Sequence, residues 1–481
     1  MSQSDRGLRR LAAGTLLVAF QGATAPDWVL RELAGGLGGV TLFGFNVESA
    51  AQVGALAATL RAAGDPVISL DEEGGDVTRL AYHVGSPYPG NAALGAVDDA
   101  GLTYEVYRAI GAELAACGIN FDMAPDADVN TVDDNPVIGT RSFGDDPALV
   151  SRHTVAAVRG LQSMRVAACA KHFPGHGATR LDSHLDIPVV DVTPEVLRER
   201  ELAPFVAAIE AGVKSIMTAH VVVPALTGDR PATLSPAALT GLLRRELGFD
   251  GVVVSDALDM RAVTKSVGLA GGAALSLRAG ADLLCLGPKP TYEDVRDIIT
   301  RVAADVPGER LEEAAARVAE LRAWAAGQPP VPAGDGAIGL AAARRAVRLT
   351  GVAAPLRDPL VVEVETPPTI AAGDVPWGLE LPYGERVRVK PAEADAAAIA
   401  ARAGGRSLVV VVKDAHRCAD SRRLVTALAA ARPDLTLVEM GLPIWAPEGV
   451  ARVATYGAAR VNALAAVELL TGRGPRESVL S

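Results

Sequence analysis

The segment Gly251-Val252-Val253-Val254-Ser255-Asp256 is an apolar, β-branched run that ends in an aspartate. A run of this kind without polar alternation is typical of a strand that is buried on both faces. Asp256 would then stand at the carboxyl end of a buried strand. A carboxylate at that place is costly unless it is paired or reacts, so the segment predicts both a strand and a candidate functional residue.

Similar short runs recur before residue 290, separated by Ala- and Leu-rich stretches whose apolar spacing suits amphipathic helices. Eight such units predict an α/β fold, a closed (β/α)8 barrel of the TIM type. Polar residues stand at the ends of several runs, where barrel enzymes carry their active sites. The runs are Thr15–Phe20, Gly39–Phe43, Val67–Asp71, Ile119–Met123, Ala167–His172, Ser215–His220, Gly251–Asp256 and Leu283–Gly287, and the helical stretches include Val47–Ala63, Leu102–Cys117, Ala148–Met164 and Pro194–Ala211.

A second, smaller domain is predicted after the barrel. A helix over Glu309–Trp324 is followed by the Pro- and Gly-rich residues 327–336, which have the composition of a linker. Beyond it, strand candidates alternate with Ala-rich helices, which predicts an α/β sandwich. We expect a barrel domain at 1–326, the linker at 327–336 and a C-terminal α/β domain at 337–481, with strands over Leu360–Glu365, Arg386–Lys390, Leu408–Val412 and Leu435–Met440.

Composition limits the partners. The 481 residues carry a formal net charge of -11 and no basic run of the kind that binds a phosphate backbone, so we expect no nucleic acid partner. The four cysteines lie far apart, mostly in apolar runs and without CxxC spacing, which indicates buried thiols in a reducing compartment. No apolar stretch approaches the roughly 18 residues of a membrane span, so we expect no membrane partner.

The N-terminus has two interpretations. Three arginines before Leu11–Phe20 and the small residues Ala23-Thr24-Ala25 imitate a secretory signal. We favour a first helix and a buried strand, because Gly14 and Gln21 dilute the apolar run. On this basis we expect a cytoplasmic protein, whose oligomeric state the sequence does not indicate.

A histidine-rich segment is the richest motif. Lys171-His172-Phe173-Pro174-Gly175-His176-Gly177, followed by Asp182-Ser183-His184, is typical of a loop that presents imidazoles. Its first two histidines have the i, i+4 spacing of a zinc helix, but the proline and glycine between them break any helix, and no acidic or thiol third ligand stands at the usual distance. We therefore expect no metal and no other cofactor.

Asp182 and His184 form a candidate dyad. Two residues apart in an extended loop, they lie on the same side, where a carboxylate can orient the imidazole and tune its basicity near neutral pH. A serine-hydrolase triad fits less well because Ser183 would point away. In the other interpretation, Asp182 only caps or braces the loop. The residues alone do not decide between a catalytic dyad and this structural role.

Further polar residues predict a ligand with many hydroxyl groups. Asp71 follows another strand and is soon followed by two glycines, which let a backbone approach a ligand closely. Asp71 and its acidic neighbours, with Arg79, Arg141 and Lys171, would make a polar floor, and sugars are bound through such hydrogen-bonding groups.

These segments resemble the family-3 glycoside hydrolases, and in particular their bacterial β-N-acetylglucosaminidase (β-N-acetylhexosaminidase) branch. The resemblance runs from about Leu16 to Gly287. In that family, the pairing of Lys-His-Phe-Pro-Gly-His-Gly with Asp-Ser-His separates N-acetylglucosaminidases from β-glucosidases, which take their acid/base from a carboxylate elsewhere. The segments that carry it are residues 39–43, 71–75, 135–144, 171–177, 182–184, 217–220, 231–235 and 255–256.

The resemblance implies a retaining exo-β-N-acetylglucosaminidase that hydrolyses terminal β-linked N-acetylglucosamine from cell-wall fragments, as in peptidoglycan recycling, or from chitin-derived fragments. It implies Asp256 as the nucleophile that forms a covalent glycosyl-enzyme, His184 as the acid/base and Asp182 as the residue that orients His184. A β-glucosidase or another exo-glycosidase of the family is the alternative, and a silent sugar-binding protein fits poorly with these three residues intact. The implied sugar-binding residues are Asp71, Arg79, Arg141, Lys171 and His172.

Two positions depart from the pattern of that family. Glu72 stands where glutamine is common, and Asp76 stands where arginine is frequent. Near the mouth of the site, two extra acids would disfavour anionic aglycones such as muropeptides. The alternative is that both side chains point into the scaffold.

A histidine acid/base has a consequence of its own. A carboxylate base would repel an anionic acceptor at short range, whereas an imidazole would not. Inorganic phosphate is therefore a candidate acceptor, and the enzyme would then release N-acetylglucosamine 1-phosphate as well as the free sugar.

Overall fold

The structure is a computed structural model that describes residues 3–180, 187–327, 337–353 and 355–472. Asp182, Ser183 and His184 lie outside the described residues, as does nearly all of the predicted linker.

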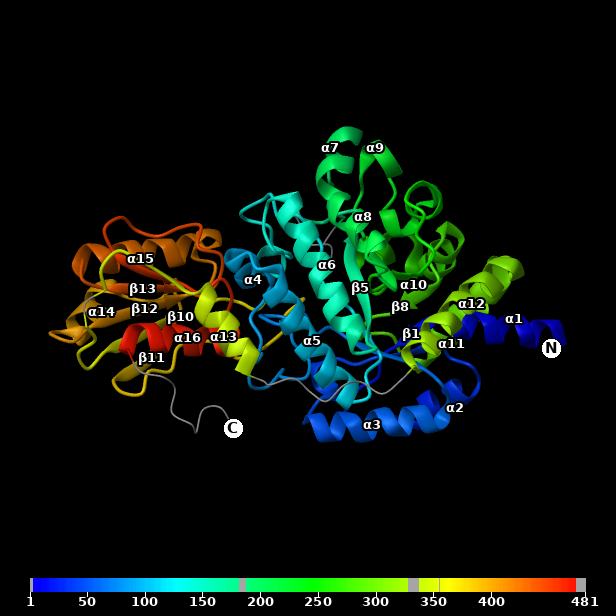
Figure 1. Cartoon of the computed structure of the whole chain (residues 1–481), viewed down its shortest axis with the longest axis horizontal. Helices are drawn as coiled ribbons and strands as arrows, with labels where there is room; N and C mark the ends of the chain where they lie inside the picture. The colour runs from blue at the N-terminus through cyan, green and yellow to red at the C-terminus, as the bar shows by residue number, and fades with distance from the viewer. Residues whose placement is uncertain (1–2, 181–186, 328–336, 354, 473–481) are drawn as a thin grey trace. The chain divides into compact units, whose positions relative to one another are not determined.

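The first part of the chain forms the predicted closed barrel, so the expected fold class is confirmed (Figure 1). Neighbouring strands all pair in parallel, and the last strand pairs back with the first through Leu284 and Leu16. Every barrel strand overlaps one of the predicted runs. The strands are β1 (Leu16–Val18), β2 (Gly39–Thr41), β3 (Val67–Leu70), β4 (Phe121–Asp122), β5 (Ala167–Phe173), β6 (Ser215–Thr218), β7 (Val252–Ser255) and β8 (Leu283–Cys285).

Apolar side chains of these strands fill one buried cluster, which explains why the runs lack polar alternation. Two of the cysteines, Cys169 and Cys285, are buried in this cluster. Burial raises the pKa of the Cys169 thiol to about 12, so this side chain is a small apolar group rather than a nucleophile.

Helices surround the barrel, and their N-termini follow local rules. Ser49 caps the helix α3 by accepting a hydrogen bond from the N–H of Gln52, and Asp146 precedes Pro147 at the start of α6. Residues 3–18 form a helix and the strand β1, as the favoured interpretation predicts. The helices are α1 (Gln3–Gly14), α2 (Asp27–Ala34), α3 (Ala50–Ala63), α5 (Ala100–Ala116), α6 (Pro147–Ser163), α7 (Pro194–Val196), α8 (Ala203–Glu210), α9 (Pro224–Thr227), α10 (Arg261–Ala279), α11 (Tyr292–Asp305) and α12 (Gly308–Ala325).

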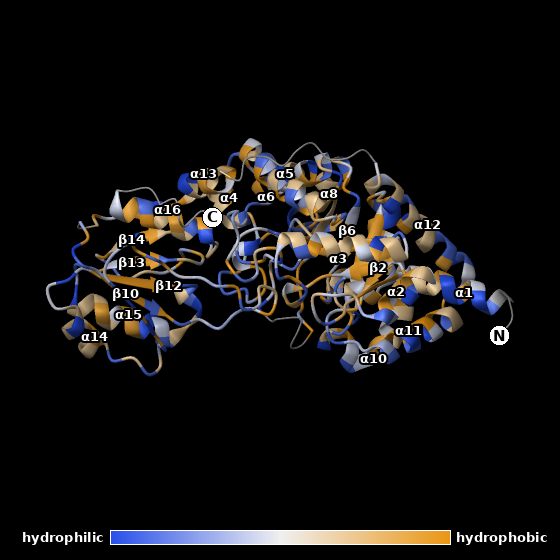
Figure 2. Ribbon diagram, turned by 90° about the horizontal axis from the view of Figure 1, so that it is seen from below, coloured by the Kyte–Doolittle hydropathy of each residue, from blue (hydrophilic) through white to orange (hydrophobic). Residues whose placement is uncertain are grey.

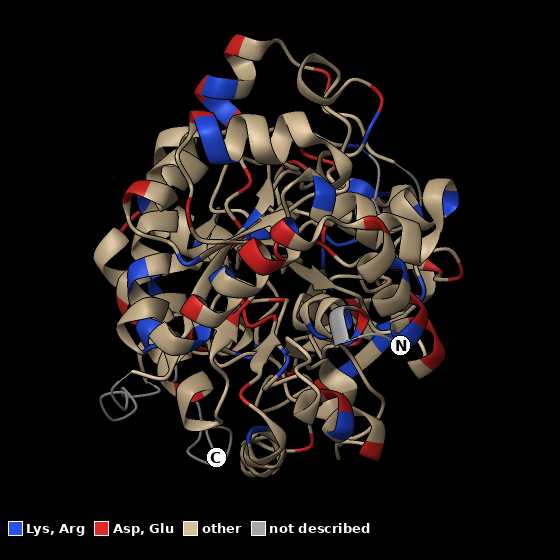
Figure 3. Ribbon diagram, turned by 90° about the vertical axis from the view of Figure 1, so that its right-hand side faces the viewer, with Lys and Arg blue, Asp and Glu red and all other residues tan. Residues whose placement is uncertain are grey.

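In the helix predicted over Pro194–Ala211, α7 and α8 are joined by a π-helical turn, Leu197–Glu201. The wider turn carries Glu201, whose side chain is fully buried. Within the described part of the chain, no helix is both long and apolar enough to cross a membrane. Lys and Arg are interspersed with Asp and Glu on the side of the molecule drawn in Figure 3.

The second sheet is also largely parallel, with helices on both faces. Its order is β11-β10-β12-β13-β14-β9, and only the pairing of β14 with the edge strand β9 is antiparallel. One face packs against α13 and α16 and the other against α14 and α15, and the strands are mostly hydrophobic in Figure 2. The elements are α13 (Ala337–Ala346), β9 (Arg348–Thr350), β10 (Leu360–Val364), β11 (Glu385–Val389), α14 (Ala396–Ala403), β12 (Leu408–Val412), α15 (Ala419–Ala431), β13 (Thr436–Glu439), β14 (Ala451–Ala454) and α16 (Arg460–Thr471).

The compact units are not continuous in sequence. Residues 74–99, which include α4 (Asn91–Val97), and residues 139–143 belong to the unit of the second sheet, together with residues 336–481. Residues 74–99 pack closely against α13. A Cβ added to Gly339 of α13 would lie only 1.9 Å from the carbonyl oxygen of Pro87, so the two backbones meet there without room for a side chain. The predicted boundary between a barrel domain at 1–326 and a C-terminal domain at 337–481 stays a prediction.

A buried charge cluster lies just before β8, at the amino end of the barrel strands. Asp282 is fully buried and forms ion pairs with Arg244, Arg310 and Arg317. Its carboxylate also accepts a hydrogen bond from the N–H of Val253 in β7. Residues at this end of a barrel stabilise the fold and do not take part in catalysis, because active sites occupy the opposite rim.

Asp282→Ala is expected to reduce the free energy of unfolding by about 3 kcal/mol, because it removes a fully buried carboxylate that compensates three partly buried arginines and accepts a hydrogen bond from Val253. Thermal and denaturant unfolding measure this loss. At a temperature where the variant is fully folded, its kcat/KM should match that of the unaltered chain, and a selective loss of kcat/KM would contradict a purely stabilising role.

Candidate active site

Polar side chains gather at the carboxyl ends of the barrel strands, as the sequence predicts. Asp71 follows β3, Asp126 and Asp128 follow β4, Lys171 and His172 lie at the end of β5, His220 follows β6 and Asp256 follows β7. Because all strands of the closed barrel are parallel, these ends share one rim. This rim is the candidate active site.

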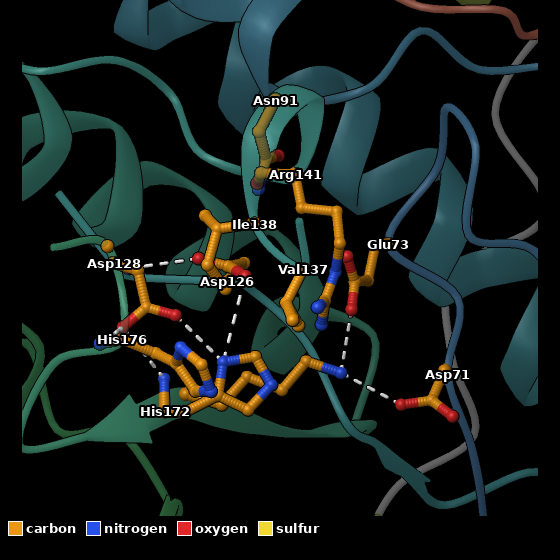
Figure 4. A network of polar contacts seen from close by, with 12 residues as sticks. Asp71, Glu73, Asn91, Asp126, Asp128, Val137, Ile138, Arg141, His172 and His176 are labelled. Carbon is orange, nitrogen blue, oxygen red and sulfur yellow. Dashed lines mark hydrogen bonds and ion pairs between the residues drawn. The ribbon is translucent and has the colours of Figure 1, made fainter. Parts of the chain in front are cut away.

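Lys171 is the buried cation of the site. Its side chain is 2% exposed, and Nζ lies 2.8 Å from Oδ1 of Asp71 and 2.7 Å from Oε1 of Glu73. Two carboxylates offset the desolvation of one ammonium, and the contacts tie the loop after β3 to β5 (Figure 4). Asp71 keeps partial exposure, so it can both hold Lys171 and face a ligand.

His172 is oriented by Asp128. Its Nδ1 lies 2.8 Å from Oδ2 of Asp128, while Oδ1 of Asp128 accepts hydrogen bonds from the backbone N–H groups of His172 and His176 at 3.3 and 2.7 Å. Asp126 lies beside them, with Oδ2 3.7 Å from the same Nδ1. A carboxylate facing Nδ1 fixes a proton there and so sets the state of Nε2.

The group Asp126, Asp128 and His172 is also the place where the described residues could hold a metal ion, since one ligand atom from each lies within 4.8 Å of the others. All three residues are buried. The oxygens of Asp128 already accept hydrogen bonds from two backbone N–H groups and the imidazole. These oxygens are already engaged, so the geometry matches a histidine whose Nδ1 proton is held by a carboxylate.

His176 and His220 support the backbone of the rim. Nδ1 of His176 lies 2.7 Å from the hydroxyl of Thr179. Nε2 of His220 lies 3.0 Å from the carbonyl oxygen of Ala257, and its Nδ1 lies 2.8 Å from the hydroxyl of Thr233. Both imidazoles are buried and hydrogen-bonded within the loops, so each braces the backbone around it.

Asp256 is partly exposed at the end of β7. Its Oδ1 accepts a hydrogen bond of 2.7 Å from the N–H of Ala257, and its own N–H donates to the carbonyl oxygen of Thr218 at 3.1 Å. His220 holds the carbonyl oxygen of Ala257, so the residue whose N–H orients the carboxylate is also anchored through its following peptide. Asp259 turns elsewhere and accepts a hydrogen bond from the N–H of Lys289.

Glu72 points into the scaffold. Its side chain is buried, and its N–H donates to Oδ1 of Asp122 at 2.9 Å. Burial raises the pKa of Asp122 well above the usual range, against the opposing effect of the hydrogen bond from the N–H of Glu72. The second of the two alternatives for Glu72 is therefore the one observed.

Asp76, Arg79 and Arg141 belong to the unit of the second sheet. The guanidinium of Arg79 donates to the carbonyl oxygens of Ala371 at 2.8 Å and Ala372 at 3.3 Å. Arg141 closes the short 3-10 helix η2 (Gly139–Arg141). A role for either arginine in sugar binding stays a prediction.

The two glycines after Glu73 serve a close approach of the chain to itself. Gly74 and Gly75 have φ of 73° and 64°, and a Cβ on Gly75 would lie 2.5 Å from Cα of Gly90. The expectation that these glycines also admit a ligand stays a prediction.

A buried acid lies beneath the histidine loop. A Cβ on Gly175 would lie 2.8 Å from both Cβ and Oε2 of Glu201, and Oε1 of Glu201 pairs with Arg200. Burial raises the pKa of Glu201. Sequence reasoning missed Asp126, Asp128 and Glu201, although the acids after β4 could have been found by their place at a strand end.

Comparisons with known proteins extend over most of the chain. Residues 21–321 match a model described as "Glycosyl hydrolase family 3 N terminal domain". A protein of Nitrosomonas eutropha named "Beta-hexosaminidase" is 34% identical over 290 residues, which cover 58% of this chain and 82% of that protein. "Beta-hexosaminidase A" of Pseudoalteromonas piscicida is 37% identical over 269 residues, 51% of this chain, and this chain spans only 45% of that protein.

A solved structure is similar over both units. The glycoside hydrolase family 3 β-N-acetylglucosaminidase from Paenibacillus sp. superimposes with a TM-score of 0.87 at 34% sequence identity. The match covers 97% of each chain.

Asp128→Asn is expected to reverse the tautomer of His172. If the amide oxygen keeps the backbone N–H groups, the amide NH2 faces Nδ1, which must then accept, so the ring proton moves to Nε2. Imidazole 15N shifts measure this change, and the loss of a charged acceptor should reduce unfolding free energy by about 1.5–3 kcal/mol. Asp305→Asn on the surface of α11 is the matched control. A ring that keeps its Nδ1 proton in Asp128→Asn would contradict the assignment.

Proposed function

Since this chain belongs to glycosyl hydrolase family 3, we propose that it is a retaining exo-β-N-acetylglucosaminidase, which removes terminal β-linked N-acetylglucosamine from cell-wall or chitin-derived fragments. The names of its relatives support this substrate class. The chemistry of the rim supports it as well, since charged and hydrogen-bonding groups converge at the carboxyl ends of the strands, as a hydroxyl-rich ligand requires.

The observation that carries the proposal is the placement of Asp256. It is a partly exposed carboxylate at a barrel strand end, and a hydrogen bond from Ala257 fixes one of its oxygens. A retaining glycosidase needs such a carboxylate to attack the anomeric carbon. The leaving oxygen departs, and the sugar remains as an ester of Asp256 until an acceptor displaces it.

His184 is assigned as the acid/base, with Asp182 as the residue that orients it. This assignment rests on the family resemblance and on the loop that leads to the dyad. Asn135 donates from Nδ2 to the carbonyl oxygens of His176 and Gly177 at 3.1 and 3.2 Å, and Asp128 holds the N–H of His176. These contacts anchor the described residues that precede the dyad in the chain.

The terminal sugar is assigned to Asp71, Lys171 and His172 on the barrel rim, with Arg79 and Arg141. Lys171 supplies a cationic donor whose position two acids fix, and His172 supplies a ring whose proton is set by Asp128. Such fixed groups lose little conformational entropy when a ligand binds.

Variants of Asp256 and His184 should differ in how their activity depends on the leaving group of the substrate. Asp256→Ala is expected to abolish turnover of every substrate. His184→Ala should spare glycosyl-enzyme formation from nitrophenyl β-N-acetylglucosaminide, whose leaving group needs no proton, but should slow cleavage of chitobiose by about 100- to 10,000-fold. Steady-state and burst kinetics measure both effects.

Equal losses on the two substrates would contradict the acid role of His184. Nitrophenyl β-glucoside serves as the specificity control in the same assays. Much higher activity on it than on the N-acetylglucosaminide would overturn the proposed substrate and select a β-glucosidase.

Phosphate is proposed as a second acceptor. Its oxygen would attack the anomeric carbon of the glycosyl-enzyme, release the carboxylate of Asp256 and form N-acetylglucosamine 1-phosphate. A neutral imidazole at the acceptor position would not repel the anion as a carboxylate would. Added phosphate should therefore speed breakdown of the glycosyl-enzyme and yield the sugar phosphate, measured by product analysis with sulfate at equal ionic strength as control. Unchanged rate and products would exclude phosphate as an acceptor.

A further inference from the structure

The second sheet has the topology of a ligand-binding fold. The chain passes from β10 to β11 on one side and then to β12 on the other, so the order reverses between β10 and β12. In open parallel sheets, ligands bind at the carboxyl ends of the strands beside such a reversal. Here that edge is met by residues 74–99, which follow Glu73 in the chain and belong to the same unit.

Asp76 brings a carboxylate from this segment to the edge. Its Oδ2 lies 3.2 Å from Nζ of Lys413, the residue after β12, and its Oδ1 accepts a hydrogen bond of 2.8 Å from the N–H of Ala458, just before α16. A cation and a backbone N–H near a helix N-terminus are the groups that bind an anion in this class of sheet. The side chain is only 8% exposed, so it is directed into the scaffold.

From Asp76 the contacts continue to Arg141. The hydroxyl of Thr140 donates to Oδ2 of Asp76 at 2.9 Å, and Nδ2 of Asn91 donates to the carbonyl oxygen of Arg141 at 2.6 Å. Both Thr140 and Arg141 lie in η2. This short helix is thus fixed by the side chain of Asp76 and by α4.

The same segment has further anchors on the second sheet. Arg79 binds the carbonyl oxygens of Ala371 and Ala372, and the hydroxyl of Tyr82 accepts a hydrogen bond of 2.9 Å from the N–H of Asp374. These contacts hold residues 74–99, whereas the contact of Asp76 with Thr140 reaches η2.

We propose that the second sheet is a positioning element for substrate binding, in which Lys413 and Ala458 hold Asp76, and Asp76 holds Arg141 through Thr140. The inference rests on the proposed function in one respect, namely that Arg141 binds the sugar. Asp76 and Lys413 are positioning residues, since they act through η2 and not on the reacting atoms.

Two variants of the 481-residue chain test this route of contacts, which runs from Lys413 through Asp76 and Thr140 to Arg141. Lys413→Met removes the cation from Asp76, and Thr140→Val removes only the link from Asp76 to η2. Each is expected to raise KM for nitrophenyl β-N-acetylglucosaminide about tenfold, the change for losing one charge-assisted hydrogen bond, with kcat within about twofold. Lys413→Arg keeps the charge and should keep KM close to that of the unaltered chain.

Lys390→Met is the matched control, because Lys390 is 62% exposed and its ion pair with Glu393 lies at the surface. Its KM should be unchanged. Unchanged KM in Thr140→Val overturns the route even if Lys413→Met fails to fold.

Hydrogen exchange separates this proposal from the proposed function. Amides of residues 139–143 should exchange faster in Lys413→Met and Thr140→Val, while those of the barrel strands should not change. If the unaltered chain does not cleave the N-acetylglucosaminide, the proposed function fails and exchange still tests the positioning. Unchanged exchange at residues 139–143 in both variants refutes the positioning role.

Discussion

The ion pairs of Lys171 with Asp71 and Glu73 are the constraint on which the candidate site depends. An ammonium that is 2% exposed must be compensated at short range, because burial removes its hydration. The compensation comes from the loop after β3, and Lys171 itself lies near the carboxyl end of β5. One buried charge therefore ties the start of the loop after β3 to the neighbouring rim of the barrel. The same loop after β3 continues into residues 74–99, which are held on the second sheet.

The barrel could be predicted because its strands are buried on both faces. Each strand is then a short apolar run, such as Val252–Ser255, that amphipathic helices separate. The central strands β10, β12 and β13 of the second sheet were predicted for the same reason, and its edge strand β11 was predicted as well. The other side of the sheet was not predicted: the edge strand Arg348–Thr350 is exposed, and its neighbour Ala451–Ala454 has little β-branched character, so neither has the pattern of a strand. No sequence pattern within Leu197–Glu201 predicts its π-helical turn. The turn carries the buried Glu201, whose surroundings come from segments distant in the sequence.

The site was predictable where position along a strand was enough. Asp71, Lys171, His172 and Asp256 were found because a parallel barrel brings the carboxyl ends of its strands together. The partner of His172 was not found, because Asp128 is 44 residues away and no periodicity relates the two. Pairings of this kind depend on the register and curvature of the whole barrel, which a single sequence does not encode in any short segment.

The two acids that depart from the family pattern show how charge is distributed between the scaffold and the site. Glu72 is buried beside Asp122, and Asp76 is compensated by Lys413, so both side chains point into the scaffold. Neither is a reason to exclude an anionic aglycone. If His184 is the acid/base and Asp256 the nucleophile, the group that an acceptor meets carries no fixed negative charge, and the ester of the intermediate neutralises Asp256. An anionic acceptor would then arrive when repulsion is smallest, which is the physical basis for proposing phosphate.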